Sequence, residues 1–330
     1  MAYFDRPLSS GPTSGSSGTI SFINPALSLL RERQALLVTG KDQGVDVSTS
    51  LAFPTADFRE LDVSFDPTHQ ALWCHMRPKG PPSFTPSLLG DLIGLRGSVQ
   101  SYMNGRVAGD GLRYFIGASR LPGIFNLGGD LGYFVDTIRS RDKARLRAYA
   151  IDCCDVSYHM AIGFDTPVVT IGLVQGDALG GGFEGAMSFQ ILVAEKSARM
   201  GLPEVLFNLF PGMGAYSFLA RKIGAAKAER MILSGKVYTA SELHELGVVD
   251  VLAEDGQGEA EVRKLISGGD ARYRLQQALT RVARRVSPLT FEELQDITDI
   301  WVDTAMQLSD VDLRKMERLA LAQRRRLERS

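Results

Sequence analysis

A run of glycines that ends in a glutamate, Gly180–Glu184 (Gly-Gly-Gly-Phe-Glu), is the first stretch of this chain that could carry out chemistry. An apolar segment at 168–174 precedes it and predicts a buried strand, and residues 183–189 predict a helix. Glycines at a strand-to-helix corner let another molecule approach the backbone, where the first N–H groups of the helix are free. A carboxylate among apolar neighbours is costly unless it has a partner or a task. Anion-binding amides beside an acid/base group indicate an enzyme.

A second glutamate, Glu204, lies twenty residues further on, within the sequence Gly-Leu-Pro-Glu-Val-Leu-Phe at 201–207. Pro203 restricts the backbone before it, and apolar residues flank it on both sides. Burial of this kind raises the pKa of a carboxyl group, which can then act as a general acid or base near neutral pH. Each glutamate alone would more often be a capping or surface residue. The corner, the spacing and the apolar flanks together favour a catalytic pair that divides acid and base duties.

A second glycine corner, Asn126–Asp130 (Asn-Leu-Gly-Gly-Asp), follows another predicted strand. One backbone N–H from each corner could converge on a carbonyl oxygen. Such a pair stabilises the enolate or tetrahedral oxyanion that forms when a thioester reacts, with about 3–4 kcal/mol per donor. Most Gly-Gly pairs are only turns, so this prediction rests on the two corners together.

The segments around these residues predict an α/β protein. Strands are predicted, in chain order, at 60–65, 71–76, 112–118 and 168–174. A helix capped by Thr85 is predicted to run to about residue 103, and helical sequence follows the first corner to about residue 163. Because ligand sites in α/β folds lie at strand ends, we expect the two corners to face one pocket.

Three parts are predicted along the chain: an N-terminal extension at 1–55, an α/β core at 56–255 and a helical C-terminal region at 256–330. We expect the extension to be partly disordered, because residues 8–19 contain too few apolar groups to fold alone; one short helix is predicted in it at 25–37. In the C-terminal region, Thr290 and Glu293 predict a capping box at the start of one helix, and Ser309 opens the next.

Composition argues against several classes of protein. The 330 residues carry a formal net charge of −1, so no basic field attracts nucleic acid or an anionic membrane. No run approaches the ~18 consecutive apolar residues of a membrane helix, and the first residues lack the layout of a signal peptide. The three cysteines have no CxxC spacing, and the four histidines show no ligand spacing with them. We therefore expect reduced thiols, a cytoplasmic location, and neither a metal nor a cofactor.

The three motifs resemble those of the enoyl-CoA hydratase/isomerase (crotonase) superfamily. The likeness covers about residues 60–255 and includes Phe210–Gly214 (Phe-Pro-Gly-Met-Gly), which follows the second glutamate. Within the superfamily the chain is most similar to bacterial diffusible-signal-factor synthases of the RpfF type, in the stretches 173–184, 201–218 and 300–308. Many CoA-dependent hydratases have a polar sequence where this chain reads Ala-Tyr-Ser-Phe-Leu at 215–219, a difference that also favours the synthases.

This resemblance implies a crotonase-like spiral of ββα units, with a C-terminal helical region that supports homotrimers or hexamers. It implies that Gly129 and Gly181 form an oxyanion hole and that Glu184 and Glu204 are the acid/base pair. Our hypothesis is that Glu204 removes the α-proton and Glu184 protonates the departing β-hydroxyl.

In such synthases a 3-hydroxyacyl chain on acyl carrier protein is dehydrated to a 2-enoyl thioester. The thioester is then hydrolysed to a cis-2-unsaturated fatty acid, a quorum-sensing signal. The same branch suggests a regulatory complex with the receiver domain of a sensor kinase.

A long acyl chain needs an apolar channel. Leu179, Gly180 and Phe183 are candidates for its wall because they belong to the pocket motif. Trp301 and Leu319 are candidates because the last helices carry much apolar sequence, although packing in the core or at a subunit interface would explain them as well.

Three functions therefore stay open at this stage. The first is signal synthesis from an acyl carrier protein, and the second is a CoA-dependent enoyl-CoA hydratase or isomerase of fatty acid metabolism. The third is a non-catalytic protein that binds a fatty acid or a signalling partner. The sequence leaves open the length and branching of the acyl chain, the carrier and the exact oligomeric state.

Overall fold

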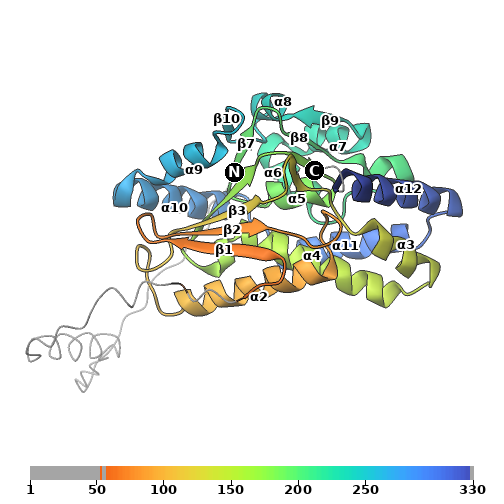
Figure 1. Cartoon of the computed structure of the whole chain (residues 1–330), viewed down its shortest axis with the longest axis horizontal. Coiled ribbons are helices and arrows are strands. Elements are labelled where there is room, and N and C mark those ends of the chain that lie inside the picture. The colour runs from red at the N-terminus through yellow and green to blue at the C-terminus, as the bar shows by residue number, and fades with distance from the viewer. Residues whose placement is uncertain (1–52, 54–56, 328–330) are drawn as a thin grey trace, which may run out of the picture. The chain divides into compact units, whose positions relative to one another are not determined.

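A computed structural model of the chain describes residue 53 and residues 57–327 (Figure 1). The described residues belong to one compact unit, Ser50–Ser330. The predicted helix at 25–37, and all of the predicted extension except Phe53, lie outside the described residues. The predicted boundary at 255/256 falls between the last strand and the four helices that end the described chain.

Six strands form the larger sheet, in the spatial order β1-β2-β3-β5-β7-β10. Their bounds are β1 Leu61–Asp66, β2 Ala71–Met76, β3 Tyr114–Ser119, β5 Val169–Val174, β7 Ile191–Glu195 and β10 Val251–Ala253. β1 and β2 form an antiparallel hairpin, and every other neighbouring pair is parallel. The four strands predicted from the sequence all lie in this sheet, with each end within two residues of its predicted position.

A smaller sheet of four short strands has the order β4-β6-β8-β9. Its strands are β4 Ile124–Asn126, β6 Asp177–Leu179, β8 Arg199–Gly201 and β9 Val237–Thr239. Three times in succession, a strand of the larger sheet is followed by one of the smaller sheet and then by a helix: β3-β4-α3, β5-β6-α5 and β7-β8-η3. The predicted spiral of ββα units is thus confirmed.

Helices cover both faces of the larger sheet (Figure 1). The α-helices are α2 Pro86–Met103, α3 Leu131–Arg139, α4 Lys143–Ala161, α5 Gly181–Met187, α6 Ala215–Ile223, α7 Ala225–Ser234, α8 Ala240–Glu245, α9 Gly258–Ile266, α10 Gly269–Val286, α11 Phe291–Ala305 and α12 Asp310–Leu327, with 3₁₀ helices η2 Gly163–Asp165 and η3 Pro203–Phe207. Trp73 belongs to a core cluster with Val262 of α9 and Tyr273 of α10. The next residue on β2, Cys74, points to the opposite face and belongs to the cluster that contains α2 and α4.

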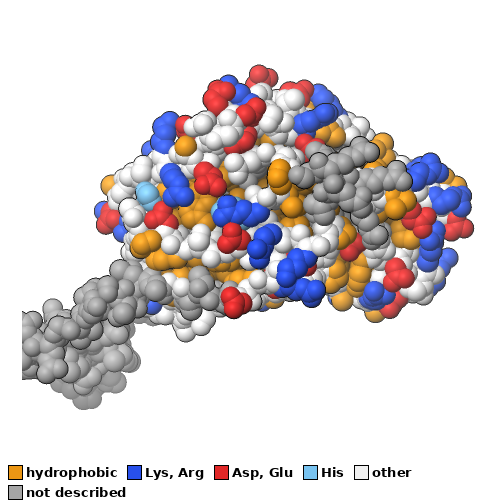
Figure 2. All heavy atoms as spheres, in the orientation of Figure 1, with side chains coloured by type: hydrophobic (Ala, Val, Ile, Leu, Met, Phe, Trp, Pro, Cys, Tyr) orange, Lys and Arg blue, Asp and Glu red, His pale blue; other side chains and the backbone are white. Residues whose placement is uncertain are grey.

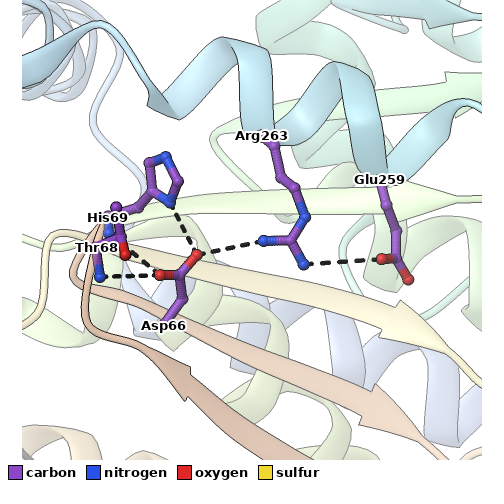
Figure 3. Close-up of polar contacts among 5 residues, drawn as sticks. All are labelled: Asp66, Thr68, His69, Glu259 and Arg263. Carbon is purple, nitrogen blue, oxygen red and sulfur yellow. Dashed lines mark hydrogen bonds and ion pairs between the residues drawn. The ribbon is translucent and has the colours of Figure 1, made fainter.

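The hairpin of β1 and β2 is fastened to α9 by charged groups (Figure 3). Asp66 accepts a hydrogen bond from the amide of Thr68 at 2.9 Å and contacts the ring of His69 at 2.8 Å. Arg263 of α9 reaches Asp66 at 3.3 Å and Glu259 at 3.9 Å. Desolvation acts to raise the pKa of Asp66, but hydrogen bonds from His69 outweigh it and hold that pKa below its ordinary value. The ionised Asp66 therefore fixes both the turn and the helix packed over it.

The predicted helical stretch after the first corner is confirmed as two helices, α3 and α4, with a break between them. At the break Arg141 adopts a left-handed φ of 57°, and Asp142 caps α4 by accepting from Arg145 N at 2.9 Å. Only half of the predicted capping box at residue 290 forms: Thr290 accepts from the backbone N of Glu293, whereas the Glu293 carboxylate pairs with Arg221 instead. The start of α12 at Ser309 is confirmed, since its hydroxyl group caps the first turn.

Among the described residues no helix is both long and apolar enough to cross a membrane.

Candidate active site

Three loops that leave the smaller sheet build one site. Strands β4, β6 and β8 are parallel neighbours, with Asn126 paired to Ala178 and Leu179 paired to Gly201. Their carboxyl ends therefore lie side by side, and the chain continues from them into the first corner, the second corner and η3. This register brings together Gly129, Gly181 and Glu204, which are far apart in the sequence.

The amide nitrogens of Gly129 and Gly181 lie close together beside one cavity. A Cβ built on Gly181 would lie 3.2 Å from the nitrogen of Gly129, and one built on Gly128 would lie 3.0 Å from the nitrogen of Gly181. Within the part of the chain that the structure describes, neither amide donates a hydrogen bond. Gly181 also opens α5, so the positive end of the helix dipole faces the same position. Two neighbouring amides of this kind can together donate hydrogen bonds to one oxygen that carries negative charge.

Glu184 lies one helical turn after Gly181 and is almost fully buried, with 2% of its surface exposed. Its Oε1 atom accepts hydrogen bonds from Met213 N at 2.8 Å and from Ala215 N at 3.0 Å. Burial raises the pKa of Glu184 to about 7, and the two amides offset part of that rise because they stabilise the ionised form.

Glu204 is held differently, although it is almost as buried. Its Oε2 atom has no hydrogen-bond partner among the described residues. Burial raises the pKa of Glu204 well above its ordinary value, and the negative charge of Glu184 raises it further. The protonated form is therefore favoured more strongly at Glu204 than at Glu184, whose ionised form the two amides stabilise.

Both carboxyls and both amides line a cavity of about 280 Å³. Its wall is mainly apolar and includes four of the five predicted substrate-binding residues: Leu179, Gly180, Trp301 and Leu319. Trp301 packs against the ring of Phe134 at 5.2 Å between centroids. A cavity with this lining suits a hydrocarbon chain that ends in one polar, reactive group.

Phe183 lies elsewhere. It is fully buried in the main core cluster and is not one of the residues that line the cavity. The reason is helical geometry: successive residues of α5 point about 100° apart, so the turn that aims Glu184 at the cavity aims Phe183 away from it. The contacts of Phe183 are those of a packing residue.

The sequence does not predict the roles of several residues that the structure places in the site. The amides of Met213 and Ala215 were part of a family motif, but nothing in it indicated that they would bind Glu184. Tyr149 and Cys153 of α4 also line the cavity. Both are polar or weakly polar residues on the buried face of α4, and this position is the sequence signal that points to them.

Comparison with known proteins gives one family. The sequence model described as enoyl-CoA hydratase/isomerase matches residues 109–293. The mitochondrial methylglutaconyl-CoA hydratase of Rattus norvegicus is 34% identical over 158 residues, which are 47% of this chain and 47% of that protein. The fatty acid oxidation complex subunit alpha of Pseudomonas syringae pv. tomato is 35% identical over 143 residues, 43% of this chain and 19% of that protein. The chain thus spans about half the length, or less, of these curated relatives.

Solved structures agree on the fold. An enoyl-CoA hydratase from Bacillus halodurans superimposes with a TM-score of 0.64 at 20% identity, over 78% of this chain and 98% of that one. A structure of DspI from Pseudomonas aeruginosa gives a TM-score of 0.57 at 22% identity, over 76% of this chain and 91% of that one. At these identities the likeness concerns the arrangement of the backbone.

Proposed function

Because the chain belongs to the enoyl-CoA hydratase/isomerase family, we propose that it dehydrates a 3-hydroxyacyl thioester to a 2-enoyl thioester and then hydrolyses the thioester. The observation that carries the proposal is one apolar cavity lined by two buried carboxyls and by two backbone amides that donate no hydrogen bond within the described residues. The product would be a free cis-2-unsaturated fatty acid.

The thioester oxygen would lie between the amides of Gly129 and Gly181. Loss of the α-proton turns this oxygen into an enolate, and attack of water on the carbonyl turns it into a tetrahedral oxyanion. Donors already aimed at the oxygen stabilise either species by about 3–4 kcal/mol each. One hole therefore serves both steps.

Elimination needs one carboxylate to accept the α-proton and one carboxylic acid to release the β-hydroxyl as water. The contacts that the described residues make with the two carboxyls favour ionised Glu184 and neutral Glu204. The division hypothesised from the sequence has Glu204 as the base. It therefore requires that thioester binding moves the proton from Glu204 to Glu184.

The acyl chain would lie along the apolar wall formed by Leu179, Trp301 and Leu319, with α12 over it. The carrier is proposed to be acyl carrier protein, as the resemblance to the synthases implies. Assembly into trimers or hexamers and a complex with a receiver domain remain predictions of that resemblance.

A CoA-dependent hydratase is the second candidate. Its support is the set of relatives described above, whose names refer to CoA esters or to fatty acid oxidation. The two candidates share the site and differ in the carrier and in the hydrolytic step.

The test is to incubate the purified protein with 3-hydroxyacyl chains of several lengths, on acyl carrier protein and on CoA, and to identify products by mass spectrometry. We expect free cis-2-enoic acid from the carrier-protein substrates. An enoyl thioester without free acid would remove the hydrolytic step, and equal or faster turnover of CoA esters would favour the second candidate. If no substrate gives a product, the remaining candidate is a non-catalytic protein that binds a fatty acid or a signalling partner.

Changing Gly180 to Ala is expected to lower this activity at least about tenfold. Gly180 has a φ of 55°, and a Cβ there would lie 2.5 Å from Oε1 of Glu204, so the carboxyl must move. Gly224→Ala is the matched control, because Gly224 also has a positive φ, 83°, but a Cβ there would meet nothing within 4 Å. Rate constants and urea midpoints of both variants separate the effect of the clash from backbone strain. Equal activity of the two variants would contradict the assigned place of Glu204.

A further inference from the structure

The loop that carries Gly129 is fixed on the side that precedes this residue. Gly128 donates its N–H to Oδ1 of Asn126 at 2.8 Å, and its carbonyl accepts from Phe84 N at 2.8 Å. The same residue has a φ of 99°, which a side chain would strain. The residue before Gly129 is thus held by two hydrogen bonds and by a backbone conformation that suits glycine.

The side that follows Gly129 is fixed by Tyr149 of α4. The Tyr149 hydroxyl accepts from Asp130 N at 3.1 Å and donates to the carbonyl of Phe84. One hydroxyl group therefore joins the end of the loop to the strand-like segment that holds its beginning. Burial raises the pKa of Tyr149 well above its ordinary value, so the hydroxyl keeps the proton that it donates.

Packing prevents the loop from relaxing in another direction. The Tyr149 ring stacks on Tyr133 at 4.9 Å and meets Phe134 edge to face at 5.3 Å. Phe134 in turn lies against the backbone of Gly129, where a Cβ would be 2.5 Å from its ring. The amides on both sides of Gly129 are hydrogen-bonded, and its own amide is left for a ligand.

We propose that Tyr149 is a positioning residue for the oxyanion hole: its hydroxyl clamps Asp130 and Phe84 so that the Gly129 amide is aimed at the thioester oxygen before the substrate arrives. This inference rests on the function proposed above. A donor that is oriented in advance needs no reorganisation during the reaction, which is where most of its effect on the rate arises. Tyr149 acts through Gly129 and need not touch the reacting atoms.

The test is Tyr149→Phe, which keeps the ring and removes the hydroxyl. We expect kcat to fall by about 10- to 100-fold with KM little changed, because the donor is misaimed but still present. A direct readout is the infrared carbonyl stretch of a bound 2-enoyl-CoA. Hydrogen bonds from the hole lower this frequency in the wild-type protein, and the lowering should be smaller in Tyr149→Phe.

Tyr133→Phe is the matched control, because it removes a hydroxyl from the ring stacked on Tyr149 without touching the loop. It should keep the wild-type kcat and carbonyl frequency. Asn126→Ala removes the acceptor of the Gly128 amide, on the other side of Gly129, and should reproduce the defect of Tyr149→Phe. It provides a second test of the inference if Tyr149→Phe does not fold.

Wild-type kcat and carbonyl frequency in a folded Tyr149→Phe or Asn126→Ala variant would overturn the inference. If the wild-type protein itself neither converts nor polarises an acyl thioester, the proposed function fails first, and the two failures are thereby distinguished.

Discussion

Replacing either Glu184 or Glu204 by Gln is expected to lower the rate of dehydration by about 10²- to 10⁴-fold, the range for loss of a general acid or base. The substitution keeps the shape of the side chain and removes its ability to exchange a proton. Because the two residues act on one substrate as a unit, the double variant should be only slightly slower than the slower single variant. Single-turnover rates with a 3-hydroxyacyl thioester measure the effect apart from binding and product release.

Exchange of the α-proton with solvent deuterium assigns the roles within the pair. The variant that lacks the base should lose both exchange and elimination, whereas the variant that lacks the acid should still exchange the α-proton. Glu195→Gln serves as the control, since Glu195 is equally buried but bonds to Gln175 and Gly258 away from the cavity. Wild-type turnover in both cavity variants would refute the assignment of the pair.

The strands of the larger sheet could be predicted from the sequence, because their apolar residues form a local pattern. Long apolar strands such as β2 and β5 are buried along their whole length and stand out as apolar runs. The strands of the smaller sheet, such as β6 and β8, have three residues each, which is too short for a periodic pattern. Their pairing nevertheless places the two glycine corners and Glu204 together. The sequence therefore predicts candidate catalytic residues, but the short strands that bring them together show no pattern of their own.

The partners of the site residues could not be predicted, because they come from distant parts of the chain. Glu184 binds amides 29 and 31 residues further on, and Asp130 binds a hydroxyl 19 residues away on another helix. A glutamate among apolar residues implies that some partner exists. Which amide supplies it depends on the packing of α5 against α6, and only the three-dimensional structure contains that information.

Burial of Glu184 predicts that its ionisation lowers the free energy of unfolding as the pH rises. Burial raises its pKa to about 7 in the folded protein, from the ordinary value of 4.5. A carboxyl whose folded pKa is raised favours the folded state most below its unfolded pKa, and this contribution is lost as pH rises from about 4.5 to about 7. Glu184→Gln removes the ionisable group, so the variant should be more stable than wild type by about 1–3 kcal/mol at pH 8. At pH 5 the difference should be small.

Urea unfolding of both proteins at pH 5 and pH 8, at one protein concentration, measures the difference. Glu242→Gln is a control of opposite sign: hydrogen bonds from Lys236, and then from Thr239 N, lower the pKa of Glu242 to about 2. The Glu242 carboxylate stabilises the fold above its unfolded pKa. Glu242→Gln should therefore lower the free energy of unfolding at pH 8, and this effect should shrink as the pH falls toward 2. A Glu184→Gln variant that is inactive and no more stable than wild type at pH 8 would mean that Glu184 ionises without a penalty from burial. The two amides would then compensate the desolvation fully, and the site would gain its reactive carboxylate at no cost to the fold.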